Sequence, residues 1–215
     1  MTGKLFKILL AGICAVTITT GCKSREEKAL DTIKDEMFKT LYDFESYQVV
    51  DTKIDSLKMD CYGDTVIFDK VQQIWFINEE LNKIKKEVDD ALSTMRIWGG
   101  STYYSATARK EMEEAQEKYD TNMKEWKDWI DVWKNLENEI KEEAATLDNA
   151  QYGWLVTHKF RCKTRGGNST LATYVYLMDD DCKTIYRVLD EDNATWDDYK
   201  AKIDAIMTGN TDSIE

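Results

Sequence analysis

Two long stretches of apolar residues at helical spacing, separated by Gly99-Gly100-Ser101, constrain the fold of this chain more than any other feature. The first runs from Asp64, a favourable N-cap residue, to Trp98, and the second continues to Leu147. In both, apolar residues recur every three or four positions, and the sequence contains no proline to interrupt them. Because a short glycine turn must bring such helices together antiparallel, we predict a helical hairpin over residues 64–149.

The residues on either side of this hairpin predict shorter helices and strands. Apolar residues recur at helical spacing near both ends of the mature chain, whereas β-branched residues and a period of two indicate strands elsewhere. The predicted helices are residues 26–42 and 195–207, and the predicted strands are residues 46–57, 152–163, 170–178 and 184–189.

The predicted fold class is α+β. An antiparallel sheet, made of one early strand plus a three-strand meander, is combined with N- and C-terminal helices and the long inserted antiparallel helical hairpin. Residues 22–63 and 150–207 form the α+β body, residues 64–149 the hairpin and residues 208–215 a loose tail. We expect the far half of the hairpin to project, and replacement of residues 64–149 by a short turn to leave a folded sheet.

The first 21 residues are typical of an export signal. Lys4 and Lys7 precede an apolar run that is too short to span a bilayer as a stable helix. The run ends in Thr20-Gly21-Cys22, which resembles a bacterial lipobox, although Thr19 stands where leucine is usual. We therefore expect residues 1–21 to be a lipoprotein signal peptide and Cys22 to carry fatty acyl chains such as palmitate. The alternative is an ordinary signal peptide with Cys22 free.

The charge of the chain excludes some partners. There are 29 Lys and Arg against 41 Asp and Glu, a formal net charge of −12, and no basic run is present. Because nucleic-acid binding needs a cationic surface, we expect no nucleic acid among the partners. Aromatic residues make up 11% of the chain and charged residues 33%, which indicates a soluble globular body rather than a disordered or membrane-embedded one.

One face of the predicted meander is a candidate ligand-binding surface. If Gly166-Gly167 forms a two-residue turn, alternation along the strands places basic side chains beside tyrosines. The candidate ligand-binding residues are Lys159, Arg161, Lys163, Tyr174 and Tyr176. Such a face could bind an anionic sugar or a peptide carboxylate, because arginine donates two hydrogen bonds to carboxylate oxygens and tyrosine stacks on sugar rings. Alternatively, an acidic helix covers this face through ordinary salt bridges.

The remaining reactive side chains give no catalytic or metal pattern. His158, the only histidine, falls on the apolar side of its strand, so we expect it to be buried and hydrogen-bonded. We expect no metal, no cofactor and no enzymatic activity, since no nucleophile and base are paired. Cys61, Cys162 and Cys182 are expected to remain free thiols, although a disulfide between Cys61 and either of the others is possible in an oxidising compartment.

Three segments resemble proteins of one bacterial group. Residues 37–41 (MFKTL), 44–50 (FESYQVV) and 153–168 (GWLVTHKFRCKTRGGN) are similar to lipoproteins of gut Bacteroidetes to which no activity is assigned. The resemblance spans most of the mature chain and implies an outer membrane lipoprotein, on the periplasmic or the cell-surface side. Triplets containing Ser56 and Ser213 resemble the O-glycosylation acceptor of these bacteria.

These features favour a non-enzymatic function. The leading hypothesis is a membrane-anchored binding or structural protein that presents its helical hairpin to a protein partner. The alternative is a glycan- or peptide-binding module that uses the basic, tyrosine-rich sheet face. A hydrolase comes third.

Overall fold

The α+β fold predicted from the sequence is confirmed by a computed structural model, which describes residues 23–101 and 105–210. Within these residues the helices are α1 (Arg25–Thr40), α2 (Thr65–Trp98), α3 (Ala106–Ala144) and α4 (Trp196–Thr208). The strands are β1 (Gln48–Lys58), β2 (Gln151–Lys163), β3 (Ser169–Asp179) and β4 (Ile185–Asp190), joined in the order β1-β2-β3-β4 as one antiparallel sheet. Short 3₁₀ segments occur at Phe44–Ser46 and Gly99–Ser101.

Side chains that satisfy free backbone N–H groups set where the helices begin. Ser24 and Glu27 form a reciprocal capping box at α1, and Thr195 with Asp198 forms another at α4. The Asp64 carboxylate accepts hydrogen bonds from the first N–H groups of α2, as the sequence predicts. These caps account for three helix starts that lie within a residue of the predicted positions.

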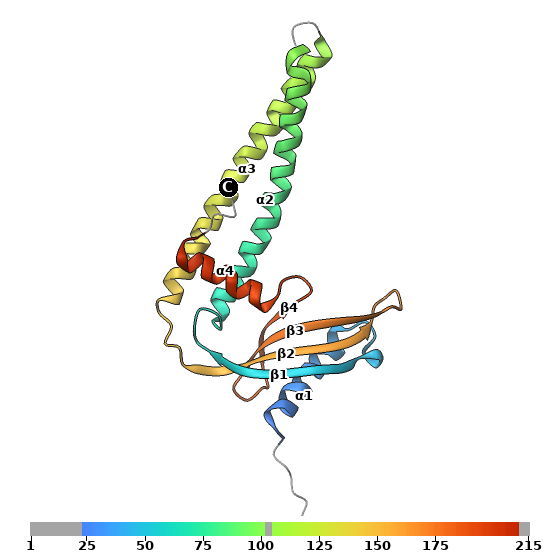
Figure 1. The fold of residues 1–215 in the computed structure, drawn as a ribbon, viewed down its shortest axis with the longest axis vertical. Helices are drawn as coiled ribbons and strands as arrows, with labels where there is room; N and C mark the ends of the chain where they lie inside the picture. The colour runs from blue at the N-terminus through green and yellow to red at the C-terminus, as the bar shows by residue number, and fades with distance from the viewer. Residues whose placement is uncertain (1–22, 102–104, 211–215) are drawn as a thin grey trace, which may run out of the picture.

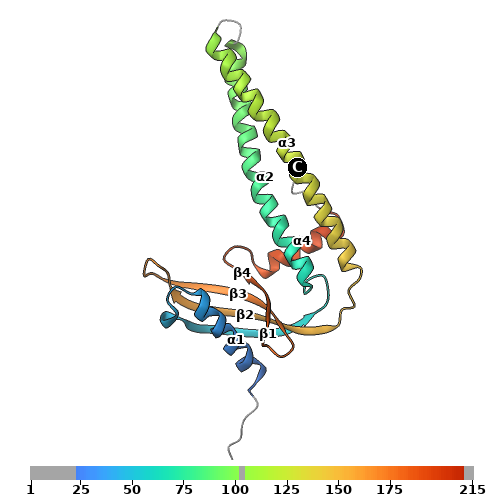
Figure 2. The ribbon, with the colours of Figure 1, turned by 180° about the vertical axis from the view of Figure 1, so that it is seen from behind.

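The sheet lies between two helical layers (Figures 1 and 2). Helix α1 covers one face, while α4 and the adjoining ends of α2 and α3 cover the other. The beginning of α1 is therefore on the opposite side of the sheet from the hairpin (Figure 1).

Each layer has its own buried apolar cluster. On the α1 side the cluster consists of Ala29, Ile33, Met37, Val156, Phe160, Cys162, Ala172, Tyr176, Met178 and Cys182. On the hairpin side it consists of Leu57, Ile67, Phe68, Val71, Ile74, Ile77, Leu81, Trp133, Leu136, Ile140, Val175, Leu177, Leu189, Tyr199, Ile203 and Ile206. The second cluster joins strands, both long helices and α4, so the root of the hairpin is part of the core that folds with the sheet.

The distal part of the hairpin projects away from the sheet (Figures 1 and 2). Helix α2 has 34 residues and α3 has 39, so each is about 50 to 60 Å long. Large buried side chains of α2 end at Ile84, and beyond it the buried positions hold Ala91 on α2 and Ala108 and Ala115 on α3. Within the described residues, no helix combines the length and apolar character needed to cross a bilayer.

Candidate binding cleft on the helical hairpin

The predicted pairing of β2 with β3 is wrong by one residue. The turn is a three-residue loop rather than a two-residue one, because Thr164 N donates to Asn168 O at 2.9 Å. Of the three loop residues, only Gly167 takes a left-handed conformation, with φ 78°, as such a loop requires of its last residue. His158 consequently pairs with Tyr174, and Val156 with Tyr176. A shift of one residue exchanges the faces of a strand relative to its partner.

The corrected register separates the predicted ligand-binding residues. Tyr176 is fully buried among the residues that pack against α1, and Tyr174 lies against the same cluster. Lys159, Arg161 and Lys163 share the other side of β2, where Lys159 is half-buried and the other two are exposed. The basic, tyrosine-rich face is therefore absent, and its five residues form no joint site.

The alternative prediction was that acidic residues of a helix pair with the basic side chains of the sheet. The structure shows such a pair for a neighbouring arginine, Arg187, instead. Arg187 of β4 donates from Nε and Nη2 to the two carboxylate oxygens of Asp69 on α2, at 2.6 and 2.5 Å. This bidentate ion pair links the sheet to the root of the hairpin, the part of α2 nearest the sheet. Within residues 23–101 and 105–210, Lys159, Arg161 and Lys163 make no ion pair.

His158 is buried and hydrogen-bonded, as predicted. Its side chain is 0% exposed, with Nε2 at 2.7 Å from the Tyr47 hydroxyl and Nδ1 at 2.8 Å from the Thr52 hydroxyl. Burial lowers the pKa of His158 from 6.5 to about 4, so the ring is neutral near pH 7. A neutral ring held by two hydroxyls inside the core is a structural group without access to a substrate.

The other reactive residues are dispersed. Cys61, Cys162 and Cys182 are free thiols, as predicted, and burial raises the pKa of each. In the part of the chain that the structure describes, no three His, Cys, Asp or Glu side chains are grouped to hold a metal ion. Ser56 is exposed on edge strand β1, whereas Cys22 and Ser213 lie outside the described residues.

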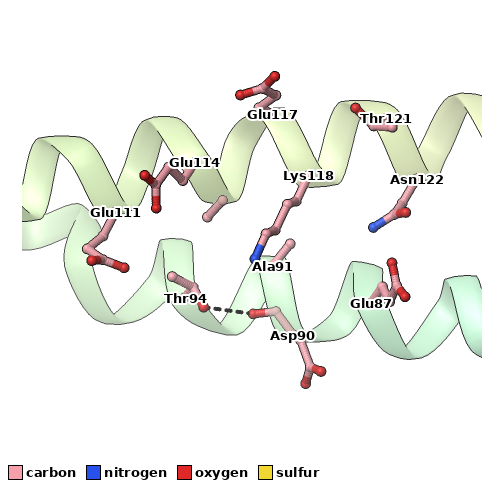
Figure 3. A pocket seen from close by; sticks show the side chains of 11 residues that line it. Glu87, Asp90, Ala91, Thr94, Glu111, Glu114, Glu117, Lys118, Thr121 and Asn122 are labelled. Atoms are coloured by element: carbon pink, nitrogen blue, oxygen red, sulfur yellow. Dashed lines mark hydrogen bonds between the residues drawn. The ribbon is translucent and has the colours of Figure 1, made fainter.

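A cleft of about 690 Å³ opens between α2 and α3 in the distal hairpin (Figure 3). Its carboxylates come from Glu87 and Asp90 of α2 and from Glu111, Glu114 and Glu117 of α3. The one cation in this lining, Lys118, points from α3 toward Ala91 and Asp90 on α2 (Figure 3). Glu114 also makes an exposed ion pair with Lys110, at 3.4 Å. The lining is therefore acidic on both helices.

Small residues and one asparagine shape this cleft. Ala91 and Ala115 are buried but small. They leave open the space between α2 and α3 that larger apolar side chains fill nearer the root. Asn122 is 8% exposed, and its amide points across the cleft toward Glu87 (Figure 3). No side chain or backbone group of the described residues forms a hydrogen bond with this amide. The amide atoms are not among the buried unpaired groups, so they face the open cleft, where they can pair with water or with a partner.

The sequence contained a signal for this cleft. Ala108, Ala115 and Asn122 follow one another at intervals of seven, which is the spacing of one helix stripe. Apolar character alone would place the next residue, Met123, in the stripe, yet Met123 is 39% exposed. Two alanines followed by an asparagine at heptad spacing indicate a weakly packed, polar stretch between helices.

Comparison with protein-family models, with curated proteins and with solved structures finds no match to this chain. The geometry of the fold and of the cleft therefore forms the basis for a functional proposal.

Proposed function

We propose that this protein is a non-enzymatic binding module, anchored to the outer membrane through lipidated Cys22, that presents its distal hairpin to a protein partner. The observation that supports this most is the projection of α2 and α3 well beyond the core they share with the sheet (Figures 1 and 2). A hairpin needed only for stability would end where its large buried side chains end, near Ile84.

The position of α1 supports an anchored arrangement. Only Lys23 and Ser24 separate Cys22 from the first residue of α1. Because α1 begins on the side of the sheet opposite the hairpin, a lipid on Cys22 would hold the membrane there and direct the hairpin away from it (Figure 1). The hairpin tip would then stand beyond the body, where a second protein can reach it.

The chemistry of the cleft favours a partner with exposed lysine or arginine side chains. Carboxylates on both helices attract cations and pair with them through charge-assisted hydrogen bonds. The Asn122 amide adds an acceptor oxygen and a donor to the same cleft. Leu92, 42% exposed, and Ile97, 68% exposed, provide apolar contact area on the distal part of α2.

Substitution of the lipidation residue tests the anchor. We expect Cys22→Ala to move the protein from the membrane fraction to the soluble fraction, because the acyl chains would supply the attachment at about 0.8 kcal/mol per buried CH₂. Mass spectrometry of the wild-type N-terminus should find acylated Cys22. Retention of the variant in washed membranes would show that another contact holds the protein there.

Matched charge reversals test the partner. We expect the double variant Glu87→Lys and Glu117→Lys, inside the cleft, to reduce recovery of the partner at least tenfold after crosslinking in the native cell. The control is Asp89→Lys with Glu113→Lys, which makes the same charge change at exposed positions of α2 and α3 outside the cleft. Equal loss of recovery in both variants, or partner crosslinks confined to the sheet, would contradict the assignment to the cleft.

A further inference from the structure

A second cleft, of about 520 Å³, lies at the hairpin root between α2 and the loop after β4. Helix α2 contributes Gln72, Trp75, Phe76, Asn78, Glu79 and Asn82, which lie at intervals of three and four along one side. The opposite wall comes from residues 188–190 and 193–194. This cleft is separate from the distal one, which begins at Glu87.

Aromatic rings form one surface of this root cleft. Phe76 is 54% exposed, although it makes an edge contact with Trp129 at 6.0 Å between ring centroids. Trp75 is half-buried and contacts Tyr199 in the core, at 6.2 Å. Trp75 is therefore held by the core, while Phe76 offers free apolar area to a ligand.

The polar groups opposite are partly organised and partly unpaired. Asp190 accepts hydrogen bonds from the backbone N of Asp192 at 3.0 Å and from the Asn193 amide at 3.1 Å, which holds the loop in place. In contrast, Gln72 Nε2 is buried without a hydrogen-bond partner. The side chains of Asn78 and Asn82 likewise make no hydrogen bond within the described residues. A buried unpaired amide is uncommon in proteins, so a ligand that pairs with Gln72 would remove a cost, while the accessible amides of Asn78 and Asn82 are free to bond with the same ligand.

The kinds of group in this lining select a class of ligand. Four amides, on Gln72, Asn78, Asn82 and Asn193, can each both donate and accept, which matches hydroxyl groups. Lys, Arg and His are absent from the lining, so nothing in it favours an anion. A simple cation would use the carboxylates of Glu79 and Asp190 but leave the amide donors unpaired.

We propose that this root cleft binds a neutral saccharide. One face of a sugar ring packs on Phe76 and Trp75, and its hydroxyls bond with the amides of Asn78 and Asn82 and with the Glu79 carboxylate. The Gln72 amide, which lines the cleft and has its nitrogen buried, pairs with a hydroxyl that reaches it. The site is independent of the distal cleft, so either can exist without the other.

Calorimetric titration of the full mature chain tests this site. The protein is kept in a detergent without a sugar head group, and the probes are neutral gluco-, manno-, xylo- and N-acetylglucosamine oligosaccharides up to millimolar concentration. We expect at least one series to bind. Phe76→Ala and Asn82→Ala should each weaken that binding about tenfold, the upper end for losing one contact of this kind.

A neighbouring amide provides the control. Gln73→Ala removes an exposed amide from the same helix outside the cleft and should bind like the wild type. Asn82 and Phe76 are exposed, so their variants should remain folded, as circular dichroism would verify. The proposal is overturned if no probe binds the wild type or if both variants bind normally.

Discussion

Removal of the whole hairpin is expected to unfold the protein, whereas removal of its distal part should leave the fold intact. In the first variant a short glycine loop replaces residues 64–149. The hairpin-side cluster would then lose its cover over the strand residues Leu57, Val175, Leu177 and Leu189 and over the inner face of α4. Exposing seven large side chains at about 2 kcal/mol each costs more than 10 kcal/mol. A domain of this kind has only about 5 to 15 kcal/mol of stability in total.

Loop closure would not account for that unfolding. Met59 N donates to Ala150 O at 2.8 Å, and Asn149 N donates to Met59 O at 3.0 Å, so the two ends of the hairpin are already adjacent. A short loop can join them without moving β1 or β2. Loss of the buried cluster is then the remaining cause of the expected unfolding. The structure reverses our sequence-based expectation that the sheet would survive without residues 64–149.

The second variant joins Lys86 to Asn122 through a short glycine-containing loop and omits residues 87–121. It retains the large buried residues of α2 up to Ile84 and those of α3 from Trp133 onward. Asparagine is also a favourable residue for starting the shortened α3. We expect cooperative melting, with a melting temperature within a few degrees of the wild type.

Thermal melts and proton NMR dispersion on the wild type and both variants would compare these outcomes. A folded protein without residues 64–149 would show that the sheet and α1 suffice. An unfolded protein after distal removal alone would show that the projection contributes to the core. The distal variant also serves the functional proposal, because it removes the cleft without removing the anchor.

Periodicity in the sequence predicted most of the fold. The spacing of apolar residues defined both long helices, and alternation on β2 separated Val156, His158 and Phe160 from Lys159 and Arg161, as the burial pattern confirms. These features depend on local side-chain direction, which the period of a helix or strand determines. The hairpin and the meander were therefore accessible without a structure.

The pairing of neighbouring strands was not accessible in the same way. The Gly166-Gly167 pair suits either a two-residue or a three-residue loop, and the conformation of Gly166 distinguishes them, because a two-residue turn would need a positive φ there and only Gly167 has one. That one-residue difference moved Tyr174 and Tyr176 to the α1 side and removed the predicted ligand face. Sites that combine two strands depend on register, which in a hairpin is fixed by the turn type and the loop length.

The root cleft was missed for another reason. The root cleft joins α2 to the loop after β4, and these segments are more than 100 residues apart in the sequence. Periodicity placed Gln72 and Asn82 on the outer side of a helix, where amides are ordinary. Only the packing of α2 against the sheet brings Asp190 and Asn193 opposite them.

Acid is expected to destabilise the protein through His158, in a pH range set by its lowered pKa. Burial disfavours the charged imidazolium, and the charge of Lys34 adds to this. The unfolded chain takes up a proton near pH 6.5, while the folded protein does so only near pH 4. The contribution of the neutral ring is therefore complete above pH 6.5, decreases as the pH falls toward 4, and decreases no further below it.

His158→Gln separates this contribution from the effect of the many carboxylates. Glutamine cannot titrate, but its amide can accept from one neighbouring hydroxyl and donate to the other, as the neutral ring does with Tyr47 and Thr52. Between pH 7 and pH 4 the free energy of unfolding of the wild type should fall by about 3 kcal/mol more than that of the variant, at 1.36 kcal/mol per pKa unit. Urea denaturation at several pH values gives both curves. Because His158 is the only histidine, its imidazole signal in NMR gives the pKa of the folded state directly. A midpoint near 6.5, or parallel curves for the two proteins, would show that water reaches the ring and that the hydroxyl pair does not keep it neutral.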